Sequence, residues 1–304
     1  MKGFAARLLW SALTLLGASL LVFSLARAVP ADPVAVYAGP QADAETRARI
    51  RKEMGLDDPF WQQYLRYLSH AAKGDLGKSI VTSEVVSEAI STRFPTTLAL
   101  SVGGVFVWLV VGIPLGLLTA LNRGRRVDRW ALVVSMIGIS LPVFWLGRML
   151  QYELAYRRGL LPVAGLQSWQ HLILPSLTLG LVGAGYYARL VHSSVSDALN
   201  QDFVRTARAK GAGLQRVLLR HALPNALLPL LTVLGADIAG LLGGVVFTES
   251  VFALPGMGAL AVQSVLNLDV PMIMGTVLFA ALMVVAANLI VDLLYRVIDP
   301  RIRA

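Results

Sequence analysis

The 304-residue sequence contains no cysteine and few charged side chains, and each scarcity excludes a class of protein. Without cysteine the chain can form neither a disulfide-stapled scaffold nor a thiolate metal site. Charged residues make up 15% of the chain, whereas a typical soluble domain has about 25%. Hydrophobic residues make up 56% and the mean hydropathy is +0.65, so intrinsic disorder is excluded as well. This composition is typical of an integral membrane protein.

Six apolar stretches are long enough to cross a bilayer, whose hydrocarbon core of about 30 Å requires about 20 helical residues. They are residues 8–26, 98–121, 130–150, 172–191, 226–247 and 273–294. Lipid offers backbone groups no hydrogen-bond partner, so each stretch must form a helix or a strand of a closed barrel. The alternating segments of about 10 residues that barrel strands require are absent from the sequence. We therefore predict an all-α integral membrane protein with six transmembrane helices.

Basic residues concentrate in alternate connections between these stretches, which predicts the orientation of the chain. Of 27 lysines and arginines, 15 lie in the N-terminal segment, the second and fourth loops and the C-terminal tail. The N and C termini are therefore expected to be cytoplasmic. The segment 29–97 has eight basic residues and is expected outside, because long loops escape this rule. The same distribution accounts for the net charge of +9 without a nucleic-acid partner.

The first stretch has an alternative interpretation as a secretory signal peptide. Lys2 and Arg7 precede it, and Ala26-Arg27-Ala28 has the small-x-small pattern of a cleavage site. Cleavage would leave five spans. The apolar run of 19 residues is longer than a signal core of about 7 to 15 residues, which favours an uncleaved transmembrane helix.

Two segments imitate motifs of nucleotide and nucleic-acid binding. Residues 72–79, AKGDLGKS, fit a relaxed phosphate-loop pattern, but the preceding FWQQYLRYLSHAAK predicts a helix where a phosphate loop requires a strand. Residues 202–221 are typical of a basic helix-turn-helix. Since they are held between two predicted spans, a recognition helix there could not enter a major groove. We expect neither ATP nor nucleic acid to bind these segments.

Instead, the segment 202–221 predicts a helical hairpin that could dock a partner protein. Val195, Leu199, Phe203 and Ala207 recur at i+4, so one face of its first helix is expected to be apolar. An apolar stripe with a basic rim suits a groove in a partner protein. A membrane-surface hairpin with solvated arginines is the simpler alternative.

The second half of the hairpin is predicted from its glycines and prolines. Gly211-Ala-Gly213 supplies the turn, and a second helix is expected to begin at Leu214. Val217 and Leu218 would form its apolar face, while Arg216 and Arg220 lie on another face. Pro224 and Pro229 would mark the entry to the fifth span.

The same loop resembles the signature of ABC-importer permeases, Glu-Ala-Ala-x3-Gly-x9-Ile-x-Leu-Pro. Aligned on Gly211, the chain keeps Ala207, Leu223 and Pro224. It departs at three positions, with Arg205 for the glutamate, Thr206 for the first alanine and His221 for the isoleucine. The variant RTARAKG followed by RHALPNALLP is similar to the dipeptide, oligopeptide and nickel permease branch of that superfamily.

Further motifs of that branch occur along nearly the whole chain and in the same order. They are Asp32-Pro33, Gly74–Ser79, Arg93–Thr97, Ser140–Trp145, Glu249–Phe252, Pro255–Gly258 and Asp292–Arg301. One mismatch is Leu268, where the branch often has arginine.

The resemblance implies a type I ABC-importer-like permease, a multi-pass protein of the bacterial plasma (inner) membrane. Residues 1–28 would form the first transmembrane helix, 29–97 an extracytoplasmic segment, and 98–304 a five-helix permease core with a cytoplasmic coupling loop at 192–225. The implied partners are a second homologous permease subunit, two ATPase subunits, an extracytoplasmic solute-binding protein and membrane lipid. This chain would be no enzyme and would bind no cofactor, because ATP and Mg²⁺ belong to the partner subunits.

The implied solutes are di- and oligopeptides, with nickel chelates or glutathione as alternatives. The residues implied in coupling to the ATPase are Phe203, Arg205, Thr206, Ala207, Arg208, Lys210, Gly211, Leu223 and Pro224.

Two other classes of membrane protein stay open from the residues alone. A secondary transporter predicts inverted repeats, and no convincing repeat is visible; a non-transporting scaffold is the third class.

Asp237 is the most deeply placed charge in the predicted spans. A charge at a helix centre costs about 2.5 to 3.5 kcal/mol on insertion scales, so such residues usually face a cavity or a partner. Asp237, Gly240 and Gly244 form our candidate translocation path, and a hydrogen-bonded aspartate at a helix interface is the structural alternative.

The small-xxx-small spacing of Gly112 with Gly116, and of Gly240 with Gly244, predicts close helix packing. The four histidines share no metal-ligand spacing, so no metal site is expected.

Overall fold

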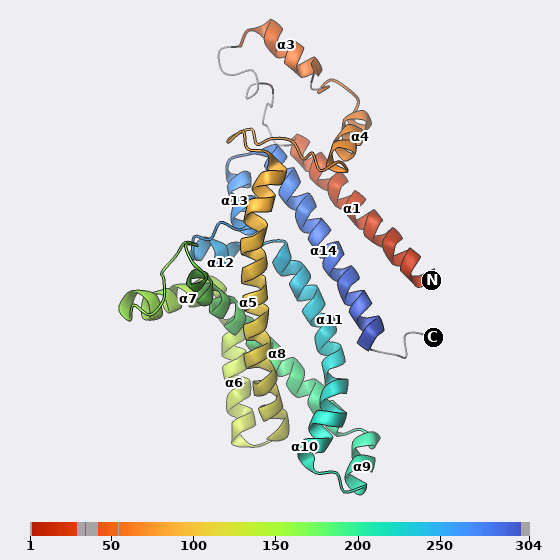
Figure 1. Ribbon diagram of the computed structural model, residues 1–304, viewed down its shortest axis with the longest axis vertical. Helices are drawn as coiled ribbons and strands as arrows, with labels where there is room; N and C mark the ends of the chain where they lie inside the picture. The colour runs from red at the N-terminus through yellow and green to blue at the C-terminus, as the bar shows by residue number, and fades with distance from the viewer. Residues whose placement is uncertain (1, 29–33, 35–41, 54, 299–304) are drawn as a thin grey trace. The chain divides into compact units, whose positions relative to one another are not determined.

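The computed structural model describes the chain except for residues 1, 29–33, 35–41, 54 and 299–304 (Figure 1). Within the described part every regular element is helical, and one isolated bridge joins Lys78 and Val85. The elements are α1 (Lys2–Ala28), α3 (Ala44–Glu53), α4 (Phe60–Ala71), α5 (Val86–Leu121), α6 (Arg126–Ser140), α7 (Val143–Leu150), the π-helix η1 (Gln151–Arg157), the 3-10 helix η2 (Trp169–Leu172), α8 (Ile173–Leu199), α9 (Asp202–Ala209), α10 (Leu214–Val217), the π-helix η3 (Leu218–Ala222), α11 (Leu223–Leu242), α12 (Val246–Val251), α13 (Met257–Leu266) and α14 (Val270–Ile298). The all-α prediction is confirmed.

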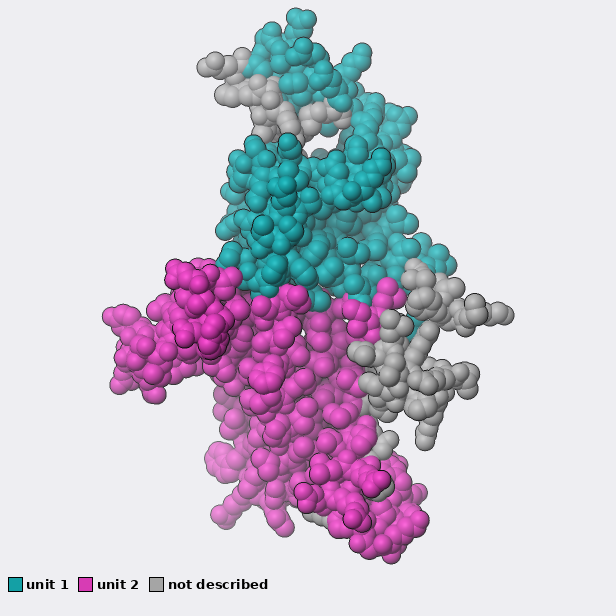
Figure 2. Space-filling model, viewed as in Figure 1, with its two compact units in different colours: residues 1–97, 242–246, 255–286 teal, residues 98–241, 247–254, 287–304 magenta. Residues whose placement is uncertain are grey.

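The chain divides into two compact units, shown in separate colours in Figure 2. Unit 1 comprises residues 1–97, 242–246 and 255–286. Unit 2 comprises residues 98–241, 247–254 and 287–304. Helices α5 and α14 each contribute residues to both units.

Two small apolar cores lie in the described part of unit 1. In the first, Val22 and Phe23 of α1 pack with Tyr64 of α4 and Met274 of α14. A hydrogen bond of 2.9 Å between Ser19 Oγ and the Tyr64 hydroxyl ties α1 to α4. The second core joins the start of α5 to α13 and α14 and consists of Val86, Ala89, Ile90, Met257, Leu260 and Met272.

Unit 2 is built on close packing of α5 against α8. A Cβ added to Gly112 would lie 3.0 Å from the Ala184 carbonyl oxygen, and one added to Gly116 would lie 2.5 Å from that of Ala188. The two backbones can approach this closely only because the glycines lack side chains. The packing predicted for Gly112 and Gly116 is confirmed.

Three helices in the described part are long and apolar enough to cross a membrane by length and composition. They are residues 9–27 of α1, all of α5, and residues 270–291 of α14. The predicted fourth and fifth stretches lie largely in α8 and α11, which do not meet both criteria in the described residues. Residues 126–140 and 143–157 form a bent pair of helices, which adds a fourth span if the pair is counted as one.

The prediction of one continuous helix over 130–150 is wrong. Helix α6 ends at Ser140, α7 begins at Val143, and the pair is bent by 99°. The cause is Pro142, which has no N–H to donate and disfavours helical backbone at the residue before it. Leu141 accordingly adopts φ −75° and ψ 127°. This bend turns the chain away from the axis of α6.

The close packing predicted for Gly240 with Gly244 on one helix is also wrong. Helix α11 ends at Leu242, so the two glycines do not share a helical face. Gly240 has no atom within 4 Å of a hypothetical Cβ, while Gly244 has φ +128° and approaches the backbone of Gly258. The spacing rule failed because it assumes a helix through both positions.

Candidate functional site

A short helical hairpin connects α8 to α11 in unit 2 (Figure 1). Its first arm is α9 and its second arm is α10, which continues through the π-helix η3 into α11. Val204, Ala207 and Val217 form the core between the arms and are 1%, 9% and 0% exposed. Leu199 and Ala212 pack against this core. The hairpin is therefore held together by its own apolar contacts.

The turn of the hairpin depends on Gly211. This residue has φ +81°, a conformation that is costly for any residue with a Cβ. The Gly211 amide donates to the Arg208 carbonyl at 2.9 Å, and the Ala212 amide donates to the Ala207 carbonyl at 3.1 Å. These bonds satisfy carbonyls at the end of α9 and close the turn.

The outer face of the hairpin is basic and carries one large aromatic side chain. Phe203 is 39% exposed although its neighbour Val204 is buried. The exposed polar residues of α9 and the turn include Asp202, Arg205, Thr206, Arg208 and Lys210. Arg205 forms an ion pair of 3.4 Å with Asp202, and both side chains stay largely in solvent. An exposed phenylalanine on a helix that also carries exposed cations is available to a partner protein.

The prediction of one continuous apolar face over residues 195–207 is wrong. Helix α8 ends at Leu199, and Asn200 and Gln201 separate it from α9. Phe203 therefore does not continue the face of Val195, and Val204 takes the buried position instead. The i+4 pattern could not reveal this break, because no proline or glycine marks it.

The prediction for the second arm is confirmed. A short helix begins at Leu214, Val217 and Leu218 are buried, and Arg216 and Arg220 are exposed. Two further residues of the implied coupling set lie at the start of α11. Leu223 is half-buried against the core of unit 2, and Pro224 is exposed.

Asp237 is tied to α8 by a hydrogen bond. The Tyr187 hydroxyl donates to Oδ2 of Asp237 at 2.7 Å. Tyr187 is 1% exposed and stacks on Trp108 of α5, with ring centroids 5.2 Å apart. Trp108 in turn donates its indole N–H to the Leu179 carbonyl at 2.9 Å. The charge in α11 is thus linked to α8, and through the aromatic stack to α5.

Tyr187 and Trp108 could not be identified from the sequence, because an aromatic residue in an apolar stretch gives no signal of a polar contact. Asp237, which the sequence does indicate, is half-buried rather than enclosed. Of the other candidate path residues, Gly240 is exposed and faces open space in this chain. Gly244 lies beyond the end of α11 and belongs to unit 1.

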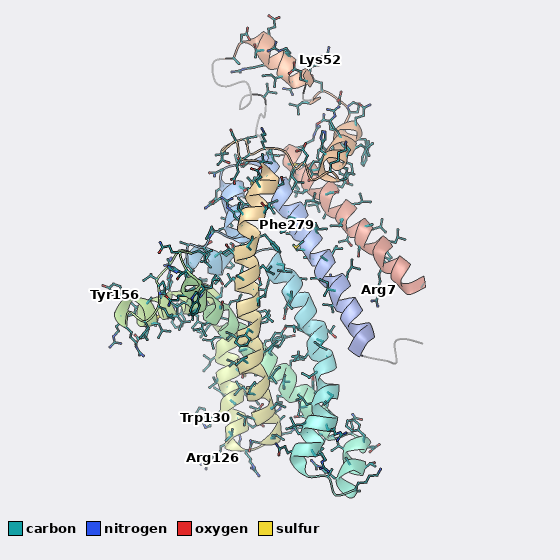
Figure 3. All side chains as sticks on the ribbon, viewed as in Figure 1. Arg7, Lys52, Arg126, Trp130, Tyr156 and Phe279 are labelled. Carbon is teal, nitrogen blue, oxygen red and sulfur yellow. The ribbon has the colours of Figure 1, made fainter. Side chains whose placement is uncertain are left out.

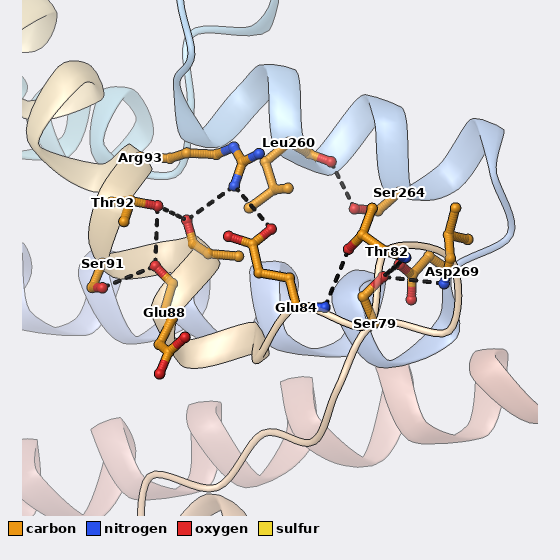
Figure 4. Close-up of polar contacts among 12 residues, drawn as sticks. Ser79, Thr82, Glu84, Glu88, Ser91, Thr92, Arg93, Leu260, Ser264 and Asp269 are labelled. Atoms are coloured by element: carbon orange, nitrogen blue, oxygen red, sulfur yellow. Dashed lines mark hydrogen bonds and ion pairs between the residues drawn. The ribbon is translucent and has the colours of Figure 1, made fainter. Parts of the chain in front are cut away.

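The segment that imitates a phosphate loop is held by side-chain contacts within unit 1 (Figure 4). Ser79 Oγ donates to Asp269 Oδ2 and accepts from the amide of Thr82 at 2.9 Å. The amide of Ile80 donates to Asp269 Oδ1 at 3.3 Å, and Arg93 forms an ion pair of 3.6 Å with Glu84. These amides bind side chains of the protein instead of converging on an open site.

The same segment follows helix α4 and not a strand, as the sequence predicts. In a phosphate loop the hydroxyl at the position of Ser79 must be available to a bound metal ion. Here it is buried and bonded to Asp269. The residues 74–79 therefore anchor a turn to the start of α14.

Among the residues that the structure describes, no three or more histidines, cysteines or carboxylates lie close enough together to hold a metal ion. His192 approaches Asp128, with Nδ1 3.7 Å from Oδ1, as a pair without a third such group. His171 bonds Ser168 at the start of η2.

Residues 112–304 match the family described as "Binding-protein-dependent transport system inner membrane component", and residues 1–101 match "Binding-prot-dependent transport system membrane comp, N-term". The first match covers more than half of the chain, and the chain belongs to this family. It is an inner-membrane permease subunit of an ABC importer and has no ATPase activity of its own.

Relatives of this chain carry names that specify a transported solute. It is 43% identical over 297 residues to "Glutathione transport system permease protein GsiC" of Salmonella paratyphi A, which covers 98% of this chain and 97% of the relative. The protein of the same name from Escherichia coli (strain K12) is 42% identical over 298 residues, with the same coverage.

The fold is similar to that of a chain from the MetNI methionine ABC transporter in an inward-facing conformation. The TM-score is 0.59 at 20% identity, over 69% of this chain and 96% of that chain. A second crystal form of the same transporter gives a TM-score of 0.57 at 22% identity. At this level of identity the likeness establishes the fold alone.

Proposed function

We propose that this permease imports short peptides, with glutathione the first solute to test. The observation that carries the proposal is the 43% identity, over almost the whole length of both chains, to a permease named for glutathione transport. Glutathione is a tripeptide, so it falls within the peptide class that the sequence motifs imply. Larger oligopeptides and nickel chelates are the competing solutes.

The hairpin formed by residues 202–217 is the surface that docks on the ATPase subunit. Support comes from Phe203, which is exposed on α9, and from Arg205 and Arg208, which are exposed on the same helix. The buried core of Val204, Ala207 and Val217 makes the hairpin stiff enough to transmit a displacement of the ATPase subunit. A partner groove with an apolar floor and an acidic rim would complement it.

Force would travel from the hairpin into the membrane through continuous helix. Helix α10 runs through η3 into α11 with no intervening loop, and Pro224 lies within this helical run. Closure of the ATPase subunits would displace the hairpin and change the arrangement of α8 and α11. The contact between Tyr187 and Asp237 joins these two helices, which makes it part of the proposed path.

The assembly would contain a second homologous permease, two ATPase subunits and an extracytoplasmic solute-binding protein. In this arrangement the N and C termini and the hairpin are cytoplasmic, and residues 29–97 lie outside. Affinity purification of the tagged chain in mild detergent tests this composition, because each expected partner can be identified by mass spectrometry.

Uptake by the reconstituted complex tests the solute. Proteoliposomes with ATP inside and binding protein outside would be offered glutathione, a dipeptide, a pentapeptide and a nickel chelate at equal concentration. We expect ATP-dependent accumulation of glutathione or the dipeptide. Accumulation of the nickel chelate alone would contradict the peptide proposal. Uptake that needs a proton gradient but no ATPase subunit would contradict import by this mechanism.

A further inference from the structure

Two arginines and a tryptophan on α6 form a basic pocket that the proposed transport mechanism does not use. Arg126, Arg129, Trp130 and Val133 line a shallow pocket of about 350 Å³ in unit 2. Figure 3 labels Arg126 and Trp130 toward the end of α6 that follows the α5–α6 turn. All four residues come from one face of the helix, because they are spaced three, four and seven positions apart.

The two cations in this pocket have no partner among the residues that the structure describes. Among the described residues, neither the Arg126 nor the Arg129 side chain forms a hydrogen bond or an ion pair, and both are exposed. Some exposed arginines are paired, as Arg157 and Arg158 are with Glu153, whereas others, such as Arg123 and Arg208, are exposed like Arg126 and Arg129. Two adjacent unpaired guanidinium groups attract an anion and can bind phosphate oxygens with charge-assisted hydrogen bonds.

The rest of the face is apolar and exposed. Trp130 is 69% exposed, and Val133 and Ile137 continue the same face at 44% and 55%. Tryptophan is enriched where headgroups meet hydrocarbon, and aliphatic side chains suit acyl chains. The order along the helix is therefore cations, then tryptophan, then aliphatic residues. This order matches the order of groups along a phospholipid.

We propose that this pocket binds the headgroup of an anionic phospholipid, with an acyl chain lying along Val133 and Ile137. A free phosphate would use the two arginines but leave the apolar face without a role. A protein partner would need side chains of opposite charge beside an apolar strip, and no described feature of this chain identifies one. Charge complementarity and the apolar continuation both favour lipid.

The test uses quenching of Trp130 fluorescence by brominated lipid in the purified transporter complex. Dibromo-phosphatidylglycerol is titrated against dibromo-phosphatidylcholine, and Trp130→Phe identifies the part of the signal that comes from the pocket. The double variant Arg126→Gln/Arg129→Gln removes the pocket cations. Its matched control, Arg123→Gln/Arg125→Gln, removes the same charge from exposed residues beside the pocket.

We expect phosphatidylglycerol to quench Trp130 at lower concentration than phosphatidylcholine. The pocket variant should need about tenfold more phosphatidylglycerol, while the control shifts by less than about threefold. Unchanged quenching by phosphatidylcholine in both variants shows that they are folded. The proposal is overturned if both variants shift equally or if the two lipids quench alike. It is also overturned if millimolar inorganic phosphate displaces the lipid, or if neither lipid reaches Trp130 in the complex.

Discussion

The Tyr187 hydroxyl holds Oδ2 of Asp237 at 2.7 Å and so joins α8 to α11 through a half-buried carboxylate. Tyr187 is itself packed against Trp108, which leaves its hydroxyl little freedom to turn elsewhere. A carboxylate fixed in this way can serve two purposes. It can link two helices, and its second oxygen can interact with a passing solute.

These purposes are separated by two substitutions. Tyr187→Phe removes the donor and should destabilise the complex by about 1 to 3 kcal/mol, because a partly buried acceptor loses its partner. Asp237→Asn keeps an acceptor for Tyr187 but removes the charge, so its thermal stability should stay close to wild type. If Asp237 lines the path, uptake at limiting solute falls in Asp237→Asn. Wild-type uptake by that variant would restrict Asp237 to a structural role.

The hairpin turn can be tested with two glycines of different conformation. Gly211 has φ +81°, whereas Gly213 lies outside the left-handed region and a Cβ there would meet nothing within 4 Å. Gly211→Ala should cost about 1 to 2 kcal/mol in the turn and weaken the coupling of ATP hydrolysis to uptake. Gly213→Ala is the matched control and should couple normally. Equal coupling in the two variants would show that the turn conformation is unimportant.

A second glycine pair tests the packing in unit 1. A Cβ on Gly244 would lie 2.7 Å from both N and Cα of Gly258, and its φ of +128° disfavours any side chain. Gly244→Ala should therefore lower the melting temperature of the purified protein, at a cost of about 1 to 3 kcal/mol. Gly240→Ala places its methyl group in open space and should leave the melting temperature unchanged or higher. Similar melting temperatures in the two variants would contradict the described contact.

The anchored turn at residues 77–86 predicts a coupled pair. Ser79 and Asp269 are 4% exposed each, and the hydroxyl of one donates to the carboxylate of the other. Ser79→Ala and Asp269→Asn should each destabilise the protein by about 1 to 3 kcal/mol, and the double variant should lose less than the sum of both. Additive losses would mean that the two side chains act independently. Lys78→Ala, in the same motif, should leave ATP binding by the complex unaltered.

Much of the fold could be predicted because the physical constraint on a membrane chain is severe. The apolar stretches at 8–26 and 98–121 lie in α1 and α5, since lipid leaves the backbone no alternative to a helix. The break at Pro142 could also have been predicted, because a proline disfavours helical backbone at the residue before it. We expected a continuous span because hydropathy alone does not register a change of direction.

The candidate site was harder to predict because it depends on contacts between distant residues. The hairpin and its turn can be predicted from local glycines and periodicity. The periodicity places Phe203 on the apolar face, however, whereas the structure buries Val204, because α9 packs against α10 in this orientation. No local pattern indicates that Tyr187 meets Asp237, 50 residues away. The hydrogen bond between Ser79 and Asp269 joins residues 190 positions apart, and no spacing pattern in the sequence indicates it.

The most direct test of the coupling hairpin uses the absence of cysteine from the natural chain. Phe203→Cys introduces a single thiol on the outer face of α9, and Leu266→Cys introduces one at a 77% exposed position of α13 as a control. We expect Phe203→Cys to crosslink to the ATPase subunit in membranes and to resist an impermeant thiol reagent added to intact cells, whereas Leu266→Cys should not crosslink. Labelling of Phe203→Cys from the cell exterior, or crosslinking no greater than that of Leu266→Cys, would contradict the account.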